Sequence, residues 1–495
     1  MKKIKYLLPI VAFLLFSCSD YLDINNSPNN LTKDKVSPDL ALAAAQTRSY
    51  TANPGNMNRL GNFFMNNWGI NVNSFAATSP QEFSLSIDSG FYGAIWDGIY
   101  FNTANYSNII NSAFENYENH KAIAKIMKAY HFQYLVDIYG DIPYFQAHTG
   151  FDDVTPAYDD DQAIYRDLVV QLDAAIATID APLASTIAVG AEDVIMGGNM
   201  ANWKKFANTL KLRILMRQSN LALTDAATAT YLTTQFATLA SATFITDDVT
   251  INPGYTNGDP TRQNPFYSRY FQTDGSQKDE FRYIRASKYM GDILNSTGDN
   301  RAGRLFDNNT VDGVLQGDLA TINSGTAPLA ITGLGTGIVN SATQDGYIML
   351  LAESLLLQAE AVHRGYLTGS AQALFDQAIA SSFTQLGAAG SAAYIGSINT
   401  VAGKGYGTGT PAQQIESIMY QKNIALQGGV NAMESFIEYT RTGLIDAIPL
   451  AISGVTKPNK PRRLLYPTSE LVGNTANVPS QTVNSVFVTG PFWRP

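Results

Sequence analysis

The stretch KAIAKIMKAYHFQYLVDIYG, residues 121–140, decides the expected fold. Its apolar side chains recur every three or four residues, at Ile123, Ile126, Met127, Tyr130, Tyr134 and Ile138. This spacing places them on one face of an α-helix. Gly140 stands where such a helix is expected to end. The stretch therefore predicts an amphipathic helix that buries one face against a neighbouring helix.

The same spacing recurs in other segments and groups them into pairs. Residues 96–110, WDGIYFNTANYSNII, repeat it and are expected to run antiparallel to the first helix, which gives a pair over 96–140. Three further pairs are expected at 159–220, 345–387 and 411–443. Helix pairs with small residues at their contacts are typical of tetratricopeptide repeats, although the spacing here is irregular. The chain is therefore predicted to be mainly α, with about four tetratricopeptide-like helix pairs.

Two long regions lack this periodicity. Residues 221–343 are rich in Thr, Gly, Asn and Asp, and residues 444–495 carry many prolines and turn residues. Loops of this length inside a compact protein are usually functional or disordered. We expect long, irregular, ligand-binding excursions that pack on a single helical body over residues 38–495.

The amino terminus has the pattern of an export signal. Three lysines precede a short apolar run, and Ser17 comes directly before Cys18, the only cysteine of the chain. The run is far shorter than the roughly 20 residues that span a bilayer. A small residue followed by cysteine resembles a lipobox, which predicts a signal peptide over 1–17, a lipid on Cys18 and a polar tether over 18–37. The alternative is a plain signal peptide with an incidental cysteine.

The composition excludes some partners. Removing residues 1–17 takes away three lysines and no acidic residue, which changes the formal charge from −9 to −12. Such a chain is a poor nucleic-acid binder, because phosphate contacts need clustered Lys and Arg. Charged residues make up 15% of the chain, against about 25% in typical domains. Its polar surface must come largely from neutral side chains, which suit neutral ligands such as sugars.

Several segments together resemble one family, the SusD/RagB nutrient-binding outer-membrane lipoproteins of the Bacteroidetes, in its SusD-like branch. The more specific of them are LVDIYGDIPYFQA (135–147) and NWKKFANTLKLRILMR (202–217). The resemblance implies four tetratricopeptide-like units in a lipid-anchored protein on the outer face of the outer membrane. It also implies a SusC-like, TonB-dependent transporter as partner, and an oligosaccharide, or in some relatives a peptide, as ligand.

Motifs for catalysis or metal binding are weak. The DDD run at 159–161 suits calcium, but an aspartate at the start of an expected helix also caps free N–H groups, and the cap is the favoured interpretation. The four histidines form no two-histidine metal signature, and no GxSxG nucleophile motif is present. We therefore predict neither an enzyme nor a cofactor. A pair of carboxylates acting as a glycoside hydrolase, and a scaffold without ligand, stay open as alternatives.

Ligand contacts are expected where flat aromatic rings stand beside hydrogen-bonding side chains. A sugar ring packs its C–H face on an aromatic ring, while its hydroxyl groups need amide, carboxylate or guanidinium partners. The early loop and the later excursion offer such mixtures at Trp68, Asn66, Asn67, Asn71, Tyr267, Arg269, Tyr270 and Tyr283. The alternative is that these aromatic residues bury a loop against the helices, since they supply packing area as readily as ligand stacking.

Overall fold

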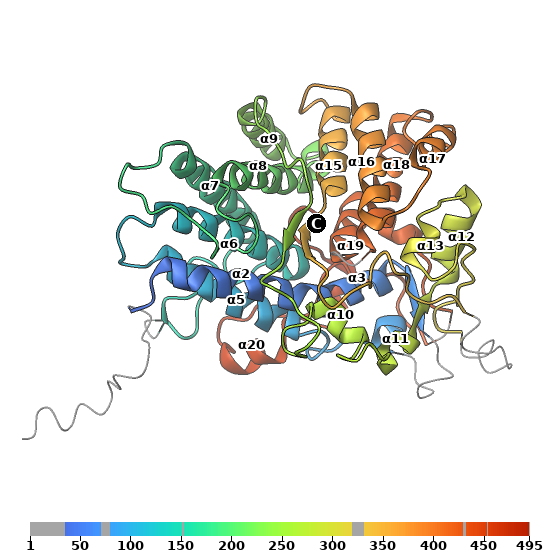
Figure 1. Cartoon of the computed structure of the whole chain (residues 1–495), viewed down its shortest axis with the longest axis horizontal. Helices are drawn as coiled ribbons and strands as arrows, with labels where there is room; N and C mark the ends of the chain where they lie inside the picture. Colours follow the sequence, from blue (N-terminus) through green and yellow to red (C-terminus); the bar gives the residue numbers. More distant parts are fainter. Residues whose placement is uncertain are drawn as a thin grey trace, which may run out of the picture.

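The computed structural model shows a helical protein with irregular segments packed around its helices (Figure 1). It describes residues 35–70, 80–150, 153–318, 331–428, 432–452 and 454–494. The predicted signal peptide, Cys18, most of the tether and Asn71 lie outside the described residues. None of the helices in the described ranges is both long and apolar enough to cross a membrane.

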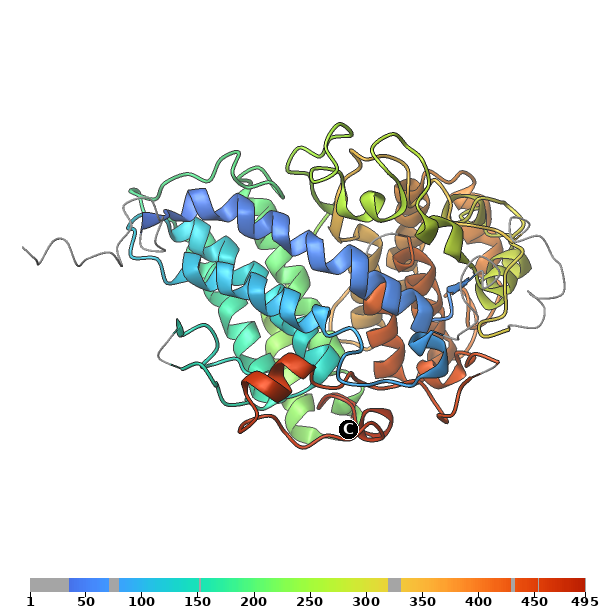
Figure 2. The same cartoon turned by 90° about the horizontal axis from the view of Figure 1, so that it is seen from below.

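The first half is a stack of long helices. Its members are α2 (Pro38–Ala52), α5 (Ala94–Ile110), α6 (Glu118–Tyr139), α7 (Asp161–Asp180) and α8 (Met200–Arg217). Each packs on the next in this order, and α2 lies along α5 in both views (Figures 1 and 2). The helix expected from the opening stretch is α6, which ends at Gly140 with a positive φ of 84° that favours glycine.

The second half repeats the arrangement. It contains α15 (Leu351–His363), α16 (Ala371–Leu386), α17 (Ser391–Ile398), α18 (Pro411–Leu426) and α19 (Ala432–Thr442). Helix α15 packs on α16 and α18, α18 packs on α19, and α15 also contacts α8 of the first half. With the exception of α17, these helices lie in the ranges where the sequence predicts helix pairs. The prediction of a mainly α, tetratricopeptide-like fold is confirmed.

Some helices were not predicted. Helix α9 (Ala226–Thr238) lies in the region expected to be irregular. Only Thr228, Leu232 and Phe236 of α9 are buried, one residue per turn, and most of its other positions are Thr or Ala. So narrow an apolar stripe gives little periodic signal. Helices α3 (Asn58–Phe64) and α12 (Lys288–Thr297) are further examples.

Two small antiparallel sheets attach the irregular segments to the helices. Strand β1 (Trp68–Ile70) pairs with β3 (Ile284–Ala286), with Trp68 opposite Ala286. Strand β2 (Val249–Ile251) pairs with β4 (Gly346–Met349). The β1–β3 pair is the one that concerns ligand binding, because it joins the early segment to the later excursion, the two regions in which contacts were expected.

Shorter elements complete the described chain. They are η3 (Asn53–Met57), α4 (Gln81–Ser84), η6 (Leu221–Leu223), α10 (Pro265–Tyr270), α11 (Asp279–Tyr283), α13 (Ala302–Leu305), η8 (Leu444–Ala447), α20 (Thr468–Gly473) and α21 (Ser485–Val488). The local sequence determines where helix α10 begins. The side-chain oxygen of Asn264 accepts hydrogen bonds from the backbone of Phe266 and Tyr267, at 2.9 and 3.0 Å, and Pro265 occupies the first turn.

Candidate ligand-binding site

Trp68 and its two asparagine neighbours lie inside the protein. Trp68 and Asn67 have no exposed surface, and Asn66 is 5% exposed. The Asn67 amide donates to the side-chain oxygens of Asn62 and Asn423, at 3.0 and 3.1 Å. A ring with no exposed surface cannot stack on a sugar, so the prediction of ligand contact at Trp68, Asn66 and Asn67 is corrected. These residues anchor the start of β1.

The predicted contact residues on helix α10 differ in how deeply they are buried. Tyr270 is 1% exposed and packs edge-on against Phe266, with ring centroids 5.2 Å apart. The prediction of ligand contact at Tyr270 is therefore also corrected, because its ring belongs to the core. Tyr267 and Arg269 are half-buried on the same helix. Both stay predicted contacts.

Half-buried aromatic rings form a corner between α10 and α11. Tyr267 stacks on Phe271 with ring centroids 4.9 Å apart and an interplanar angle of 17°. Phe271 in turn packs on Phe281 at 4.7 Å. Together with Arg269 and Tyr283 these residues are here called the α10–α11 corner. It offers a flat apolar face beside a hydrogen-bond donor, the combination expected for a sugar contact.

An ion cluster holds this corner in place. Glu280 Oε1 accepts from Arg59 Nη1 at 2.6 Å and from Arg269 Nε at 2.9 Å. Burial alone would lower the pKa of Arg59, but Tyr92 and the carboxylates of Glu280 and Glu82 raise it above its usual value. The Arg59 guanidinium also lies 6.0 Å from the centre of the Tyr283 ring. Arg59 was not predicted from the sequence, because its partner Glu280 is 221 residues away.

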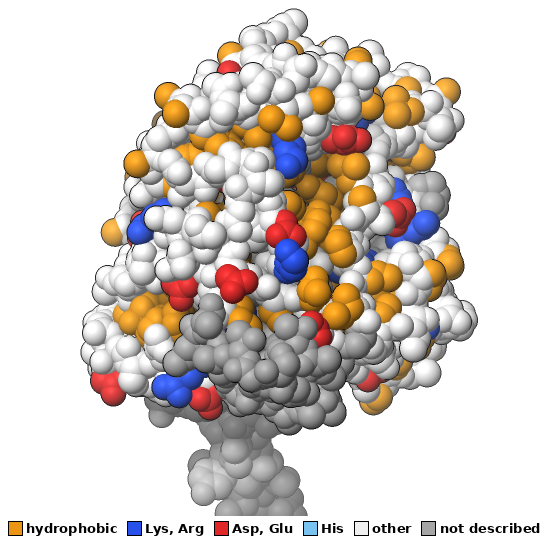
Figure 3. Space-filling view, turned by 90° about the vertical axis from the view of Figure 1, so that its right-hand side faces the viewer, with side chains coloured by type: hydrophobic (Ala, Val, Ile, Leu, Met, Phe, Trp, Pro, Cys, Tyr) orange, Lys and Arg blue, Asp and Glu red, His pale blue; other side chains and the backbone are white. Residues whose placement is uncertain are grey.

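The end of the molecule that carries α11, α12 and α13 in Figure 1 faces the viewer in Figure 3. Hydrophobic side chains gather there in an elongated hollow, and individual basic and acidic side chains stand beside them. On helix α12, Lys288 Nζ lies 2.8 Å from Asp292 Oδ1, and both side chains are exposed. This face therefore combines apolar area with charged groups, as the α10–α11 corner does.

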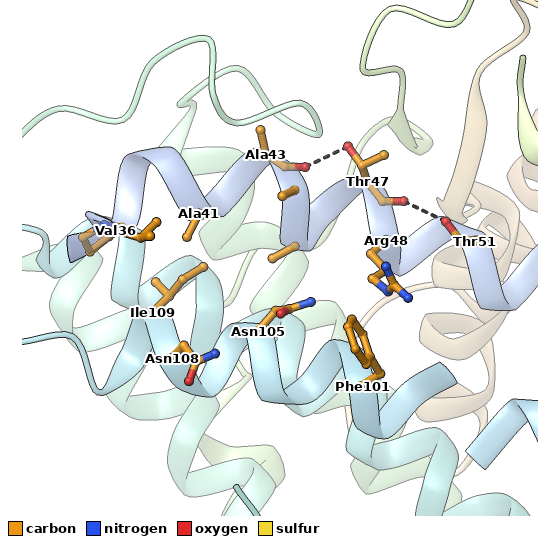
Figure 4. Close-up of a pocket in the computed structure, with 13 residues that line it drawn as sticks. Val36, Ala41, Ala43, Thr47, Arg48, Thr51, Phe101, Asn105, Asn108 and Ile109 are labelled. Atoms are coloured by element: carbon orange, nitrogen blue, oxygen red, sulfur yellow. Dashed lines mark hydrogen bonds between the residues drawn. The ribbon is translucent and has the colours of Figure 1, made fainter. Parts of the chain in front are cut away.

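A second surface lies between α2 and α5. A cavity of about 710 Å³ lies along these two packed helices, and Val36, Thr47, Asn105 and Ile109 are among its lining residues (Figure 4). Phe101 is 53% exposed, and the guanidinium carbon of Arg48 lies 3.9 Å from the centre of its ring. We call this surface the α2–α5 groove. The groove was not predicted, because the sequence of residues 96–110 indicates only a helix packed against its neighbour.

The aspartates at 159–161 have structural partners. Asp160 accepts from the backbone N–H of Ala163 at 2.8 Å, which confirms the predicted cap of α7. Oxygen atoms of Asp141, Asp160 and Asp161 lie within 4.8 Å of one another. Burial, together with repulsion from the other two carboxylates, raises the pKa of Asp161 to about 7. Asp161 also accepts from the backbone N–H of Phe492 at 2.8 Å, so it fastens the carboxyl-terminal segment to α7.

Comparison with known proteins identifies the family. A family model of SusD-like proteins, described as starch-binding and associating with the outer membrane, matches residues 28–467. The chain belongs to the SusD-like family. This SusD-like protein has no match among curated protein sequences. The family match confirms the predictions of family, of association with the outer membrane and of a carbohydrate-binding protein rather than an enzyme.

Solved structures agree with this placement of the SusD-like protein. One, named as a chitin-binding protein, is 25% identical with a TM-score of 0.71, covering 89% of this chain and 95% of its own. A chitin-binding SusD homologue from Flavobacterium johnsoniae is 22% identical with a TM-score of 0.72, and the match covers 92% of this chain and 98% of the homologue. A SusD homologue from Bacteroides fragilis is 19% identical with a TM-score of 0.73, and the match covers 93% of this chain and 99% of the homologue. The last two likenesses establish the fold.

Proposed function

We propose that this protein captures a glycan at the cell surface and delivers it to a SusC-like, TonB-dependent transporter. The observation that carries the proposal is the family match over residues 28–467. A lipid on Cys18, at the end of the signal-like segment, would hold the protein on the outer face of the outer membrane. The polar composition and low charge of the chain support a neutral ligand.

Chitin oligosaccharides are the first ligand class to test. The support is the 25% identical structure named as a chitin-binding protein. The α10–α11 corner is the proposed contact surface, because Tyr267, Phe271 and Phe281 supply adjoining ring faces and Arg269 is held beside them by Glu280. A preformed platform of this kind binds without the two opposed carboxylates that hydrolysis requires.

Calorimetry tests the proposal directly. The form lacking residues 1–18 is titrated with chitin oligosaccharides, then with a panel of other glycans and peptides, and the products are analysed after each titration. Binding of a glycan without turnover supports the capture function. Turnover would instead favour a glycoside hydrolase. Binding of peptides alone would favour a peptide-binding protein. No binding to any member of the panel would favour a scaffold without ligand.

The transporter is tested separately. Full-length protein carrying a carboxyl-terminal affinity tag is purified from mildly solubilised outer membranes, and the co-purifying proteins are identified by mass spectrometry. A TonB-dependent barrel recovered in equal amount supports the proposed partnership. Its absence, with ligand binding retained, would limit the function to capture alone.

A further inference from the structure

Lys460 is a buried cation that lacks a counter-charge. It is 5% exposed, and its ammonium group makes no ion pair or hydrogen bond with any of the described residues. Its backbone carbonyl is the group that is bonded, accepting from the Asn459 side chain at 2.8 Å. Burial lowers the pKa of Lys460 to about 7, and no acidic neighbour offsets this effect. An unpaired charge in such a position is costly, and perturbed groups of this kind cluster at functional sites.

The Lys460 side chain lines a cavity of about 560 Å³. Its lining comes from η8, from the segment 448–450, and from residues 458–460 and Arg462. Arg462 donates from Nη1 to the carbonyl of Val488 at 2.8 Å, while its buried Nε has no partner among the described residues. The residues that line the cavity thus include two basic ones, Lys460 and Arg462.

Positive charge exceeds negative charge around this cavity. Asp446 is the acidic residue in its lining, and its carboxylate is 56% exposed and lies 3.5 Å from Arg494. Burial lowers the pKa of Arg494, and the nearby charge of Arg462 lowers it further. Among the described lining residues, Lys460 and Arg462 therefore stand against the single carboxylate of Asp446, which already pairs with Arg494. A bound anion would supply the missing negative charge.

We propose that the cavity between η8 and Lys460 binds an oxyanion, with Lys460 Nζ as the donor and the charge of Arg462 beside it. The group it would take is a carboxylate, sulfate or phosphate, because these groups accept charge-assisted hydrogen bonds from ammonium and guanidinium donors. Such a group can come from an acidic sugar or from a free inorganic anion. The site is separate from the α10–α11 corner, and the inference does not depend on the proposed neutral glycan.

The test uses two probes of one chemistry. The form lacking residues 1–18 is titrated with sodium sulfate and with sodium glucuronate at pH 6, with sodium chloride keeping the ionic strength constant. We expect saturable binding of at least one probe, and at least tenfold weaker binding by Lys460→Met. Lys457→Met is the matched control, because the Lys457 ammonium is bonded to Asn484 at 2.8 Å and does not line the cavity.

The results distinguish an acidic sugar from a free inorganic anion as the source of the oxyanion, and they test the proposal. Tighter binding of glucuronate supports an acidic sugar, and equal or tighter binding of sulfate supports a free inorganic anion. Affinity should fall between pH 6 and pH 8.5 as Lys460 loses its proton. Arg462→Gln provides a second variant if Lys460→Met does not fold. No saturable binding, or equal loss in Lys457→Met, would overturn the proposal.

Discussion

Arg217 on α8 and Glu434 on α19 face each other inside the protein, and Nη2 of the arginine donates to both carboxylate oxygens, at 2.8 and 2.9 Å. Neither side chain has exposed surface. The same guanidinium also bonds Glu438 on α19 and Asp137 on α6. One arginine therefore links helices of both halves, and its position depends on carboxylates that have no access to water.

Replacing this arginine should destabilise the whole fold. Arg217→Met leaves buried carboxylates without their main partner, and breaking a buried ion pair in this way costs about 3–5 kcal/mol. We expect the free energy of unfolding, measured by urea denaturation of the form lacking residues 1–18, to fall by that amount. Ligand affinity of the folded fraction should not change, because α8 contributes no residue to the α10–α11 corner.

Lys204→Met is the matched control for this variant. Lys204 also belongs to α8 and pairs with Asp180 at 2.6 Å, but the two side chains are 37% and 49% exposed. Exposed pairs contribute about 0–1 kcal/mol. A loss in Arg217→Met no larger than in Lys204→Met would show that the buried network does not hold the two halves together.

Trp68 should matter for stability and not for ligand binding. Its ring is fully buried and packs edge-on against Phe63, with centroids 6.3 Å apart. Trp68→Ala is expected to lower the free energy of unfolding by about 3–5 kcal/mol. Trp68→Phe, which keeps a ring in place, should bind glycan with the affinity of the natural protein in calorimetry. A clear loss of affinity in the folded Trp68→Phe variant would restore Trp68 to the binding surface.

The contrast between Trp68 and Tyr267 shows what local sequence can and cannot reveal. Helix α6 was predictable, because its apolar positions repeat over many turns of one segment. Both Trp68 and Tyr267 stand among asparagine or arginine neighbours, and this composition alone does not separate them. Trp68 is buried because β1 pairs with β3, more than 200 residues later. Burial and ion pairs set by such distant segments, including Arg59 with Glu280, follow from the fold as a whole.

Stability should decrease with rising pH around Asp161. The pKa of Asp161 is about 7 in the folded protein and 3.8 in a model peptide, so the folded state binds the proton more tightly. Its contribution is complete below pH 3.8 and is lost as pH rises through about 7. Asp161→Asn keeps an acceptor for the Phe492 N–H and removes the charge. We expect this variant to flatten the change in stability between pH 5 and pH 8, measured by urea denaturation.

Asp180→Asn is the control for the pH experiment. Asp180 ends the same helix, α7, but its side chain is 49% exposed and pairs with Lys204 at the surface. This variant should follow the pH profile of the natural protein. If Asp161→Asn followed that profile too, the raised pKa of Asp161 would have no part in the pH dependence.

Lipid attachment should depend on Cys18 alone. Because the chain has no other cysteine, Cys18→Ser removes every thiol that could carry a thioether-linked lipid. Full-length protein expressed in a bacterium that processes lipoproteins is expected to incorporate labelled palmitate and to sediment with membranes. The Cys18→Ser variant should do neither, whereas Ser19→Ala should behave as the natural protein. Label incorporated by Cys18→Ser would contradict the predicted anchor.

The contributions of two aromatic surfaces to glycan binding can be compared in one experiment. Tyr267 lies in the α10–α11 corner, and Phe101 lies in the α2–α5 groove beside Arg48. Removing one stacked ring is worth about 0.5–1.5 kcal/mol, or about two- to twelvefold in affinity. We expect Tyr267→Ala to weaken glycan binding by that factor in calorimetry and Phe101→Ala to leave it unchanged, with equal thermal stability checked for both. The reverse pattern would move the glycan site to the α2–α5 groove, and no change in either variant would exclude both rings from it.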